Sequence, residues 1–256
     1  MIKVYYRISD KGNPKEKIKN AGKADCLRNA VREFGKEQIH VIADNCEPTT
    51  IEFIRNMDLS FEETSLGNCA SFIYMIEQII ATLDPMDVVY LLEDDYIHLP
   101  GSRKLLEEGL SFADYVTLYD HPNKYVLDSV SRNPFNFKQI HKTRLYVTQG
   151  THWRETDSTT MTFACKVSTL VEDLDVWKKY TKGRIPDDFH SFMSITQGEP
   201  SDLLSFLFRK MKEETFILGK NIVFRKKLKK LISAVPARAT HAEVKYLAPV
   251  IDWNNT

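Results

Sequence analysis

The stretch of sequence that decides the fold is Val88-Val89-Tyr90-Leu91-Leu92-Glu93-Asp94-Asp95. A continuous apolar run of this length is typical of a central parallel strand that is covered on both faces. Three acidic residues follow it directly. In open parallel sheets, ligands collect beyond the carboxyl ends of the strands. We therefore predict a buried strand whose carboxyl end carries a functional site.

The segments around this strand alternate between strand-like and helix-like patterns, which predicts an α/β fold with helices flanking a mostly parallel, Rossmann-like sheet. Strands are recognised by runs of apolar and β-branched residues, and helices by apolar residues at a spacing of three and four. The expected strands are 2–8, 39–43 and 115–119, and the expected helices are 25–34, 69–83 and 101–109.

The second half of the chain is less regular. Residues 144–148 and 159–165 resemble strands of a smaller antiparallel layer, and helices are expected at 170–179, 188–196 and 203–212. The sequence contains no repeat, linker or break in composition. We therefore predict a single domain over residues 1–256.

Composition excludes several classes of function. Lys plus Arg and Asp plus Glu both total 35 in 256 residues, so no global charge attracts nucleic acid. The four cysteines are widely spaced and fit no zinc signature. The first residues read as a strand, and no apolar run approaches the ~20 residues of a membrane span. A cytoplasmic protein is the expectation.

The acidic triplet is the strongest candidate for chemistry. Three adjacent carboxylates repel one another, and a divalent cation such as Mg²⁺ or Mn²⁺ would compensate their charge. A solvated acidic loop is the alternative. The position directly after a buried strand favours the metal.

This arrangement resembles the DXD motif of GT-A glycosyltransferases, here in the form Glu93-Asp94-Asp95. The first strand ends in Arg7-Ile8-Ser9-Asp10, the second ends in Asp44-Asn45, and Ser65-Leu66-Gly67-Asn68 precedes a helix, all similar to the same superfamily. Pro100-Gly101 is similar to family-2-like members. The resemblance covers most of the chain, and the order of the motifs carries more weight than any one of them.

The resemblance implies a GT-A fold that binds a nucleotide-diphosphate sugar, UDP-sugar by default, and transfers the sugar to a hydroxyl of a glycan or glycoconjugate. Residues 1–120 would form the nucleotide-sugar-binding half and residues 121–256 the acceptor-binding half. The implied nucleotide-binding residues are Arg7, Ser9, Asp44, Asn45, Asn68, Glu93 and Asp94.

The implied metal ligands are Asp95, His241 and Glu93. In GT-A enzymes a histidine near the C-terminus often completes the metal shell, and an imidazole ligand favours Mn²⁺ over Mg²⁺. Taken without the resemblance, a lone histidine is more often a surface or hydrogen-bonded residue. Glutamate replaces the first aspartate of the motif, so direct ligation by Glu93 is left open.

A catalytic base is implied at the start of a helix, as in inverting GT-A enzymes. Asp188 is the first candidate and Asp187 the second, while Asp202 offers the same chemistry. The pair after Pro186 also suits simple helix capping. Trp153 could be a stacking platform for the acceptor, or an ordinary strand residue.

Two rival functions remain open. A nucleotidyltransferase would carry a Gly-rich, basic loop after the first strand, of which Gly12-Asn13-Pro14-Lys15 is a weak version. A non-catalytic sugar-binding protein with a decayed site is the other rival. The basic run 225–230 is expected to be solvated, with peripheral membrane contact only if the acceptor is lipid-linked.

Overall fold

The computed structural model describes residues 1–12, 15–125, 143–198 and 228–255. Within these ranges a nine-stranded sheet has the strand order β3-β2-β1-β4-β9-β6-β10-β8-β7. The strands are β1 (Ile2–Ile8), β2 (Ile39–Asp44), β3 (Ser60–Thr64), β4 (Val88–Glu93), β6 (Tyr115–Thr117), β7 (Leu145–Val147), β8 (His152–Thr156), β9 (Phe163–Lys166) and β10 (Leu231–Val235). A separate two-stranded sheet pairs β5 (Tyr96–His98) with β11 (Ala239–His241).

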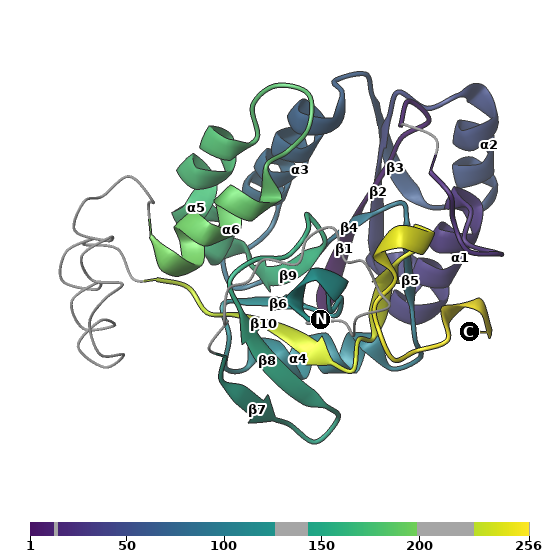
Figure 1. The fold of residues 1–256 in the computed structure, drawn as a ribbon. Coiled ribbons are helices and arrows are strands. Elements are labelled where there is room, and N and C mark those ends of the chain that lie inside the picture. Colours follow the sequence, from purple (N-terminus) through teal and green to yellow (C-terminus); the bar gives the residue numbers. More distant parts are fainter. Residues whose placement is uncertain (13–14, 126–142, 199–227, 256) are drawn as a thin grey trace.

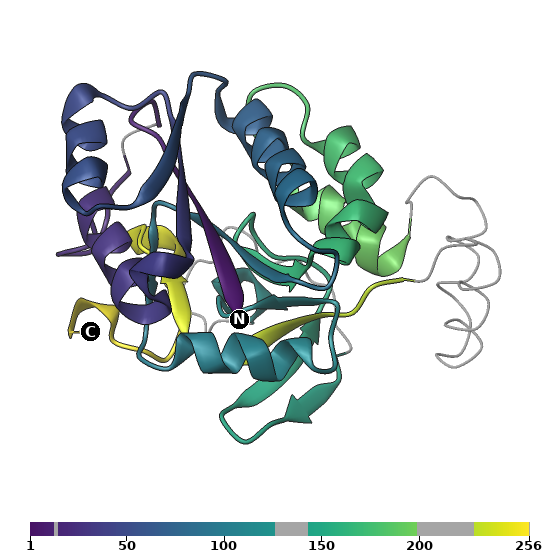
Figure 2. The ribbon, with the colours of Figure 1, turned by 180° about the vertical axis from the view of Figure 1, so that it is seen from behind.

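Helices cover both faces of the large sheet (Figures 1 and 2). They are α1 (Lys23–Phe34), α2 (Pro48–Asn56), α3 (Asn68–Thr82), α4 (Ser102–Leu110), α5 (Val167–Tyr180) and α6 (Asp188–Gln197). The buried side chains of α1, α2 and α4 share one core cluster, and those of α3, α5 and α6 share another. The expected α/β class is confirmed.

The apolar run of β4 contributes side chains to both core clusters. Tyr90 and Leu92 belong to the cluster on the α1 side, and Val89 and Leu91 belong to the cluster on the α3 side. Side chains alternate between the two faces of a strand, so a strand with helices on both faces must be apolar throughout. Burying each aliphatic side chain of this kind contributes about 1.5–3 kcal/mol relative to leaving it exposed.

The register of the parallel strands positions the first polar residues at the carboxyl edge. Strand β1 lies between β2 and β4, and Arg7 is opposite Glu93 in the β1–β4 pairing. Both strands end at nearly the same level. Residues that follow them therefore converge at one edge, as expected from the sequence.

The second half of the chain extends the same sheet. Strand β9 pairs antiparallel with both β4 and β6, and β8 and β7 continue beyond β10. The strand expected at 159–165 is shorter, because β9 begins at Phe163. Thr159 and Thr162 instead use hydroxyl groups in bonds to Thr117 and to the Glu93 amide. The helix expected at 203–212 lies outside the described residues.

The small β5–β11 sheet brings the C-terminal segment against the acidic edge. His241 is opposite Tyr96, and the Ala242 amide donates to the Asp95 carbonyl at 2.6 Å. The Ile18 amide donates to the Ala242 carbonyl at 3.0 Å. Two distant segments are thus held beside the acidic triplet. In the described part of the chain, no helix combines the length and apolarity needed to cross a membrane.

Candidate functional site

The three acidic residues after β4 have three different surroundings. Glu93 ends the strand and Asp94 and Asp95 form the turn into β5. Each carboxylate has its own cationic partner, namely Arg7 for Glu93, Lys23 for Asp94 and Lys15 for Asp95. The repulsion expected among adjacent carboxylates is therefore offset in part by side chains from β1 and the segment that follows it.

Arg7 connects β1, β4 and the start of α3. Its Nη2 donates to Glu93 Oε1 at 2.7 Å, and its Nη1 donates to the carbonyl and Oδ1 of Asn68 at 2.6 and 2.5 Å. Only 7% of Arg7 is exposed. Burial raises the pKa of Glu93, and the neighbouring guanidinium opposes that shift. The structure therefore brings together three expected nucleotide-binding residues in one network, in which Arg7 is buried, Glu93 is half-buried and Asn68 is exposed.

Asp94 is held by the end of β1. Its Oδ2 accepts a bond from the Ser9 amide at 3.1 Å and lies 3.8 Å from Lys23 Nζ. Burial, followed by the negative charge of Asp95, raises the pKa of Asp94 to about 6. Ser9 thus contacts the acidic turn through its backbone.

Asp95 is the carboxylate that meets His241. The His241 Nε2 lies 3.1 Å from Asp95 Oδ2, and Lys15 Nζ lies 3.3 Å from the same oxygen. Asp95 is 9% exposed, and its buried Oδ1 has no hydrogen-bond partner among the residues that the structure describes. Burial acts to raise the pKa of Asp95, but His241 and Lys15 outweigh it and lower that pKa well below its ordinary value.

The side chains near Asp95 are of the types that bind divalent cations, but they are not grouped as a metal site. Asp95 Oδ1 is a buried oxygen for which the described ranges supply no partner, and His241 and Glu243 add a nitrogen and a carboxylate nearby. Among the described residues, however, no three His, Cys, Asp or Glu side chains are grouped closely enough to hold a metal. The expected set of Asp95, His241 and Glu93 is only partly together, because Glu93 is paired with Arg7.

Asp44 shapes the loop before α3. Its oxygens accept bonds from the amides of Leu66 and Gly67, at 2.6 and 3.0 Å, and from the Thr64 hydroxyl at 2.9 Å. Gly67 has φ of 86°, a backbone conformation that favours glycine. Burial opposes ionisation of Asp44, but these donors lower its pKa overall. At 2% exposure, Asp44 holds the loop, and its contact with a base stays a prediction.

Asn45 follows Asp44 with a positive φ of 53°, which asparagine tolerates. Its side-chain amide donates to Asp44 Oδ2 at 2.9 Å, and its Oδ1 accepts from Lys11 Nζ at 3.2 Å. Asn45 is half-buried, unlike Asp44. Of the two residues, Asn45 is therefore the one that is accessible to a nucleotide.

The structure separates the two candidate bases at the start of α6. Asp187 caps the helix, accepts the His190 amide at 3.0 Å, and is exposed. Asp188 is turned into the protein, where burial and the charge of Glu93 raise its pKa to about 7. Asp188 is therefore electrostatically connected to the acidic site, and Asp187 has a complete structural role. Asp202 lies outside the described residues.

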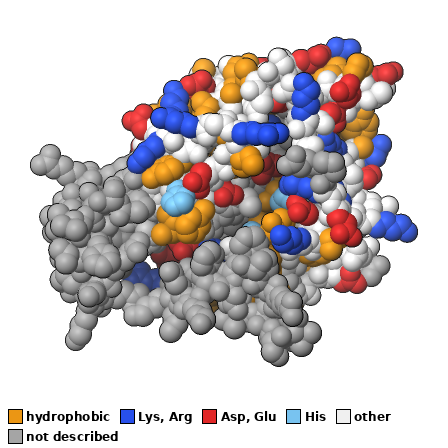
Figure 3. Space-filling view, turned by 45° about the horizontal axis from the view of Figure 1, so that its top comes forward, with side chains coloured by type: hydrophobic (Ala, Val, Ile, Leu, Met, Phe, Trp, Pro, Cys, Tyr) orange, Lys and Arg blue, Asp and Glu red, His pale blue; other side chains and the backbone are white. Residues whose placement is uncertain are grey.

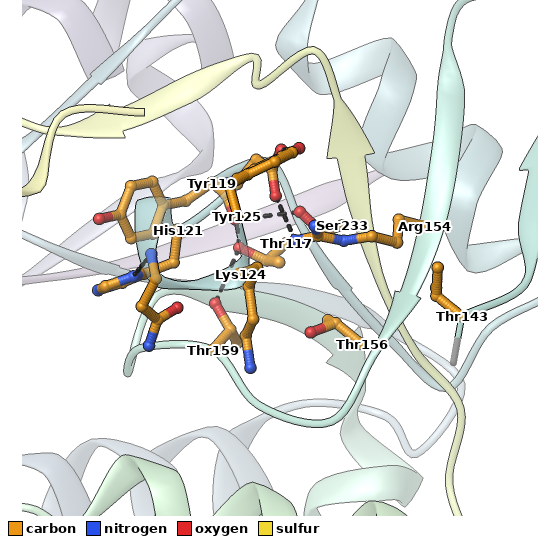
Figure 4. Close-up of polar contacts among 12 residues, drawn as sticks. Thr117, Tyr119, His121, Lys124, Tyr125, Thr143, Arg154, Thr156, Thr159 and Ser233 are labelled. Carbon is orange, nitrogen blue, oxygen red and sulfur yellow. Dashed lines mark hydrogen bonds and ion pairs between the residues drawn. The ribbon is translucent and has the colours of Figure 1, made fainter. Parts of the chain in front are cut away.

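A second polar cluster lies beyond the end of β6 (Figure 4). Buried Asp120 pairs with Arg154 and accepts the Tyr125 hydroxyl, and the figure shows Arg154 reaching across from β8. His121 lies 5.9 Å from the Tyr246 ring, and Tyr246 lies 5.8 Å from His241. The cluster thus adjoins the acidic site through two ring contacts. The sequence assigned no individual role to Asp120 or His121.

The position of Trp153 contradicts its interpretation as a stacking platform for the acceptor. Its side chain is 0% exposed, it packs beside Gly109 in the core, and its Nε1 donates to the Thr148 hydroxyl at 3.0 Å. A fully buried ring presents no face to a sugar. Trp153 is therefore a core residue of β8 and not an acceptor platform.

Three site residues were missed by the sequence reasoning, Lys15, Lys23 and Glu243. The only sequence signal for Lys15 was its place in the loop after the first strand, and Glu243 had none beyond following His241. Figure 3 tilts the top of Figure 1 toward the reader, and acidic, basic and histidine side chains lie together in the middle of this face.

Comparison with known proteins identifies the fold. No protein-family model and no curated protein sequence matches the chain. Among solved structures, GalNAc-T7 with UDP, GalNAc and Mn²⁺ aligns over 94% of this chain with 12% identity and a TM-score of 0.53. The chain has the GT-A fold. It spans 42% of the length of that structure.

Other solved structures align less closely. CMP:2-keto-3-deoxy-manno-octonic acid synthetase with CTP aligns over 92% of both chains, with 10% identity and a TM-score of 0.45. Galactosyltransferase LgtC, in complex with donor and acceptor sugar analogs, aligns over 91% of this chain and 86% of its own, with 9% identity and a TM-score of 0.42. At these identities, structural likeness establishes the fold alone. The resemblance to GT-A glycosyltransferases is confirmed at that level.

Proposed function

We propose that this GT-A chain is a metal-dependent, inverting glycosyltransferase that moves a sugar from a nucleotide diphosphate, UDP by default, to a saccharide hydroxyl. The observation that carries the proposal is the meeting of Asp95 with His241 at the sheet edge. Asp188 lies close enough to this edge for the charge of Glu93 to help raise its pKa. Nucleotide sugars bind at this edge in open α/β sheets.

Asp188 would act as the general base. A base works best when its pKa lies near the operating pH, and burial brings the Asp188 carboxyl to about 7. In its ionised form it accepts the proton of the acceptor hydroxyl as that oxygen attacks the anomeric carbon. The proton moves to the Asp188 carboxylate and the electron pair of the broken bond leaves with the diphosphate.

Asp95 and His241 would hold the divalent cation, Mn²⁺ in preference to Mg²⁺. A bound cation would offset the charge that develops on the diphosphate. The buried Asp95 Oδ1 without a partner supports this role for the aspartate. Arg7 and Asn68 would then fix Glu93 beside the nucleotide.

The test is UDP release from a panel of UDP-sugars by the purified chain, with Mn²⁺ or with EDTA. Asp95→Asn should reduce metal-dependent release at least ~10²-fold, because the variant loses a charged contact to the metal. The matched control is Asp58→Asn, an aspartate that is 89% exposed and paired with Lys36. Full activity of Asp95→Asn, or nucleotide binding that never depends on metal, would refute the proposal.

A nucleotidyltransferase is the second candidate, and one observation favours it. Lys15 and Lys23, from the segment after β1, both reach the acidic turn, which is where a triphosphate would need positive charge. Release of pyrophosphate from a nucleoside triphosphate and a sugar phosphate, with no release of UDP from UDP-sugars, would select this function. A chain that binds nucleotide with neither activity would be the non-catalytic alternative.

A further inference from the structure

Lys15 places a positive charge inside the carboxylate site. Its Nζ lies 3.3 Å from Asp95 Oδ2 and 3.3 Å from Glu243 Oε2. The two carboxylate side chains are 12% and 16% exposed, whereas the Lys15 side chain is 38% exposed. The ammonium therefore bridges two largely buried anions at the end of a side chain that reaches them from the surface.

The backbone around Lys15 explains why it reaches this position. The next residue, Glu16, accepts a bond from the Val244 amide at 2.9 Å, and the Ile18 amide donates to the Ala242 carbonyl at 3.0 Å. The segment after β1 is thus aligned antiparallel to the C-terminal segment that carries Glu243. Lys15 is anchored by its backbone neighbours, while its side chain makes two ion pairs among the described residues.

Each carboxylate of the triplet pairs with a different cation, and Lys15 is the one that pairs with Asp95. Glu93 has Arg7, and Asp94 has Lys23, which also pairs with Asp10. Asp95 has Lys15 and His241 on one oxygen, and its other oxygen has no hydrogen-bond partner in the described part of the chain.

We propose that Lys15 is a resident counter-cation of Asp95, which a divalent cation must displace in order to bind. A metal ion and an ammonium repel each other strongly within a few ångströms, so both cannot be held by one buried carboxylate at full strength. Lysine suits this exchange because its charge sits on a flexible stem and is readily rehydrated. Lys15 thereby keeps the site neutralised without metal and lowers the metal affinity of the empty protein.

This inference rests on the proposed function, because it assumes that the cation binds at Asp95. It adds a residue that sets metal affinity without being a ligand. The two carboxylates that hold Lys15 come from distant parts of the chain, so exchange at this point would also loosen the contact between the segment after β1 and the C-terminal segment.

The experiment is the binding of Mn²⁺ alone, followed by the electron paramagnetic resonance signal of unbound Mn²⁺, in the absence of nucleotide. Lys15→Met should bind Mn²⁺ up to about tenfold more tightly than the wild type, which is ~1.4 kcal/mol, since the two ion pairs of Lys15 no longer compete with the metal. Lys15→Arg keeps the charge and should stay close to the wild type. The matched control is Lys36→Met, because Lys36 is 39% exposed and pairs with Asp58 away from the site.

Equal Mn²⁺ affinities of Lys15→Met and Lys36→Met would overturn the inference and leave the proposed function standing. Tighter binding by Lys15→Arg as well would also overturn it, because the charge would then be irrelevant. Absence of Mn²⁺ binding in every variant would refute metal dependence itself and the inference with it. Should Lys15→Met fail to fold, Lys15→Gln provides the same comparison with a polar side chain of similar length.

Discussion

Replacing Asp188 with asparagine should stabilise the protein at alkaline pH while removing most of its transfer activity. Burial, followed by the charge of Glu93, raises the pKa of Asp188 from 3.8 to about 7. The ionised carboxylate is therefore poorly accommodated where it lies. Asparagine keeps the size of the side chain and removes the charge.

The sign of the stability effect follows from proton linkage. Because the folded pKa is raised, the folded state binds more protons than the unfolded state between pH of about 4 and 7, so stability falls as pH rises through that window. The full shift would correspond to ~4 kcal/mol at 1.36 kcal/mol per unit. Asp188 is partly solvent-exposed, and screening reduces the expected gain of Asp188→Asn at pH 8 to about 1–2 kcal/mol.

Ionisation of Asp188 lowers the stability of the fold but is needed for a high transfer rate. Only ionised Asp188 can accept a proton, so the rate should rise with pH and level off above pH of about 7. Loss of the base should lower kcat by ~10²–10⁴. Urea unfolding at pH 5 and pH 8, together with a pH profile of UDP release, measures both effects on the same preparations.

The neighbouring residue provides the comparison. Asp187→Ala removes the cap of α6, so it should lose about 1 kcal/mol at both pH values and keep the midpoint of the activity profile near 7. If Asp188→Asn is equally destabilised at pH 5 and pH 8, or retains wild-type kcat, the assignment of Asp188 as a base with a raised pKa is wrong.

Two further variants test the interior. Trp153→Ala should lose about 3–5 kcal/mol in urea unfolding, because it empties a fully buried site; wild-type stability with weaker acceptor binding would restore its earlier interpretation as a platform. Arg7→Met should lose about 1.5–3 kcal/mol, because half-buried Glu93 would be left without its charged partner. A second change, Glu93→Gln, should recover part of that loss, and no recovery would show that the Arg7 bonds to Asn68 dominate instead.

The local pattern of residues was enough to predict the elements that frame the site. The apolar run at 88–92 predicted the central strand because a strand covered on both faces has no room for polar side chains. The helical spacing in 69–83 predicted α3 for the same kind of reason, since Phe72, Ile76 and Ile79 must face one core. These signals repeat along the chain at the period of the element itself, so a single sequence reveals them.

Contacts between distant segments were decided by the tertiary structure. His241 meets Asp95 because β11 pairs with β5 in one particular register, and Glu243 meets Lys15 because the C-terminal segment lies along residues 16–18. Asp188 and Asp187 are equivalent in a linear reading, and only the packing of α6 turns one inward and leaves the other as a cap. No periodicity encodes such meetings, because they depend on strand register and packing between segments far apart in the chain.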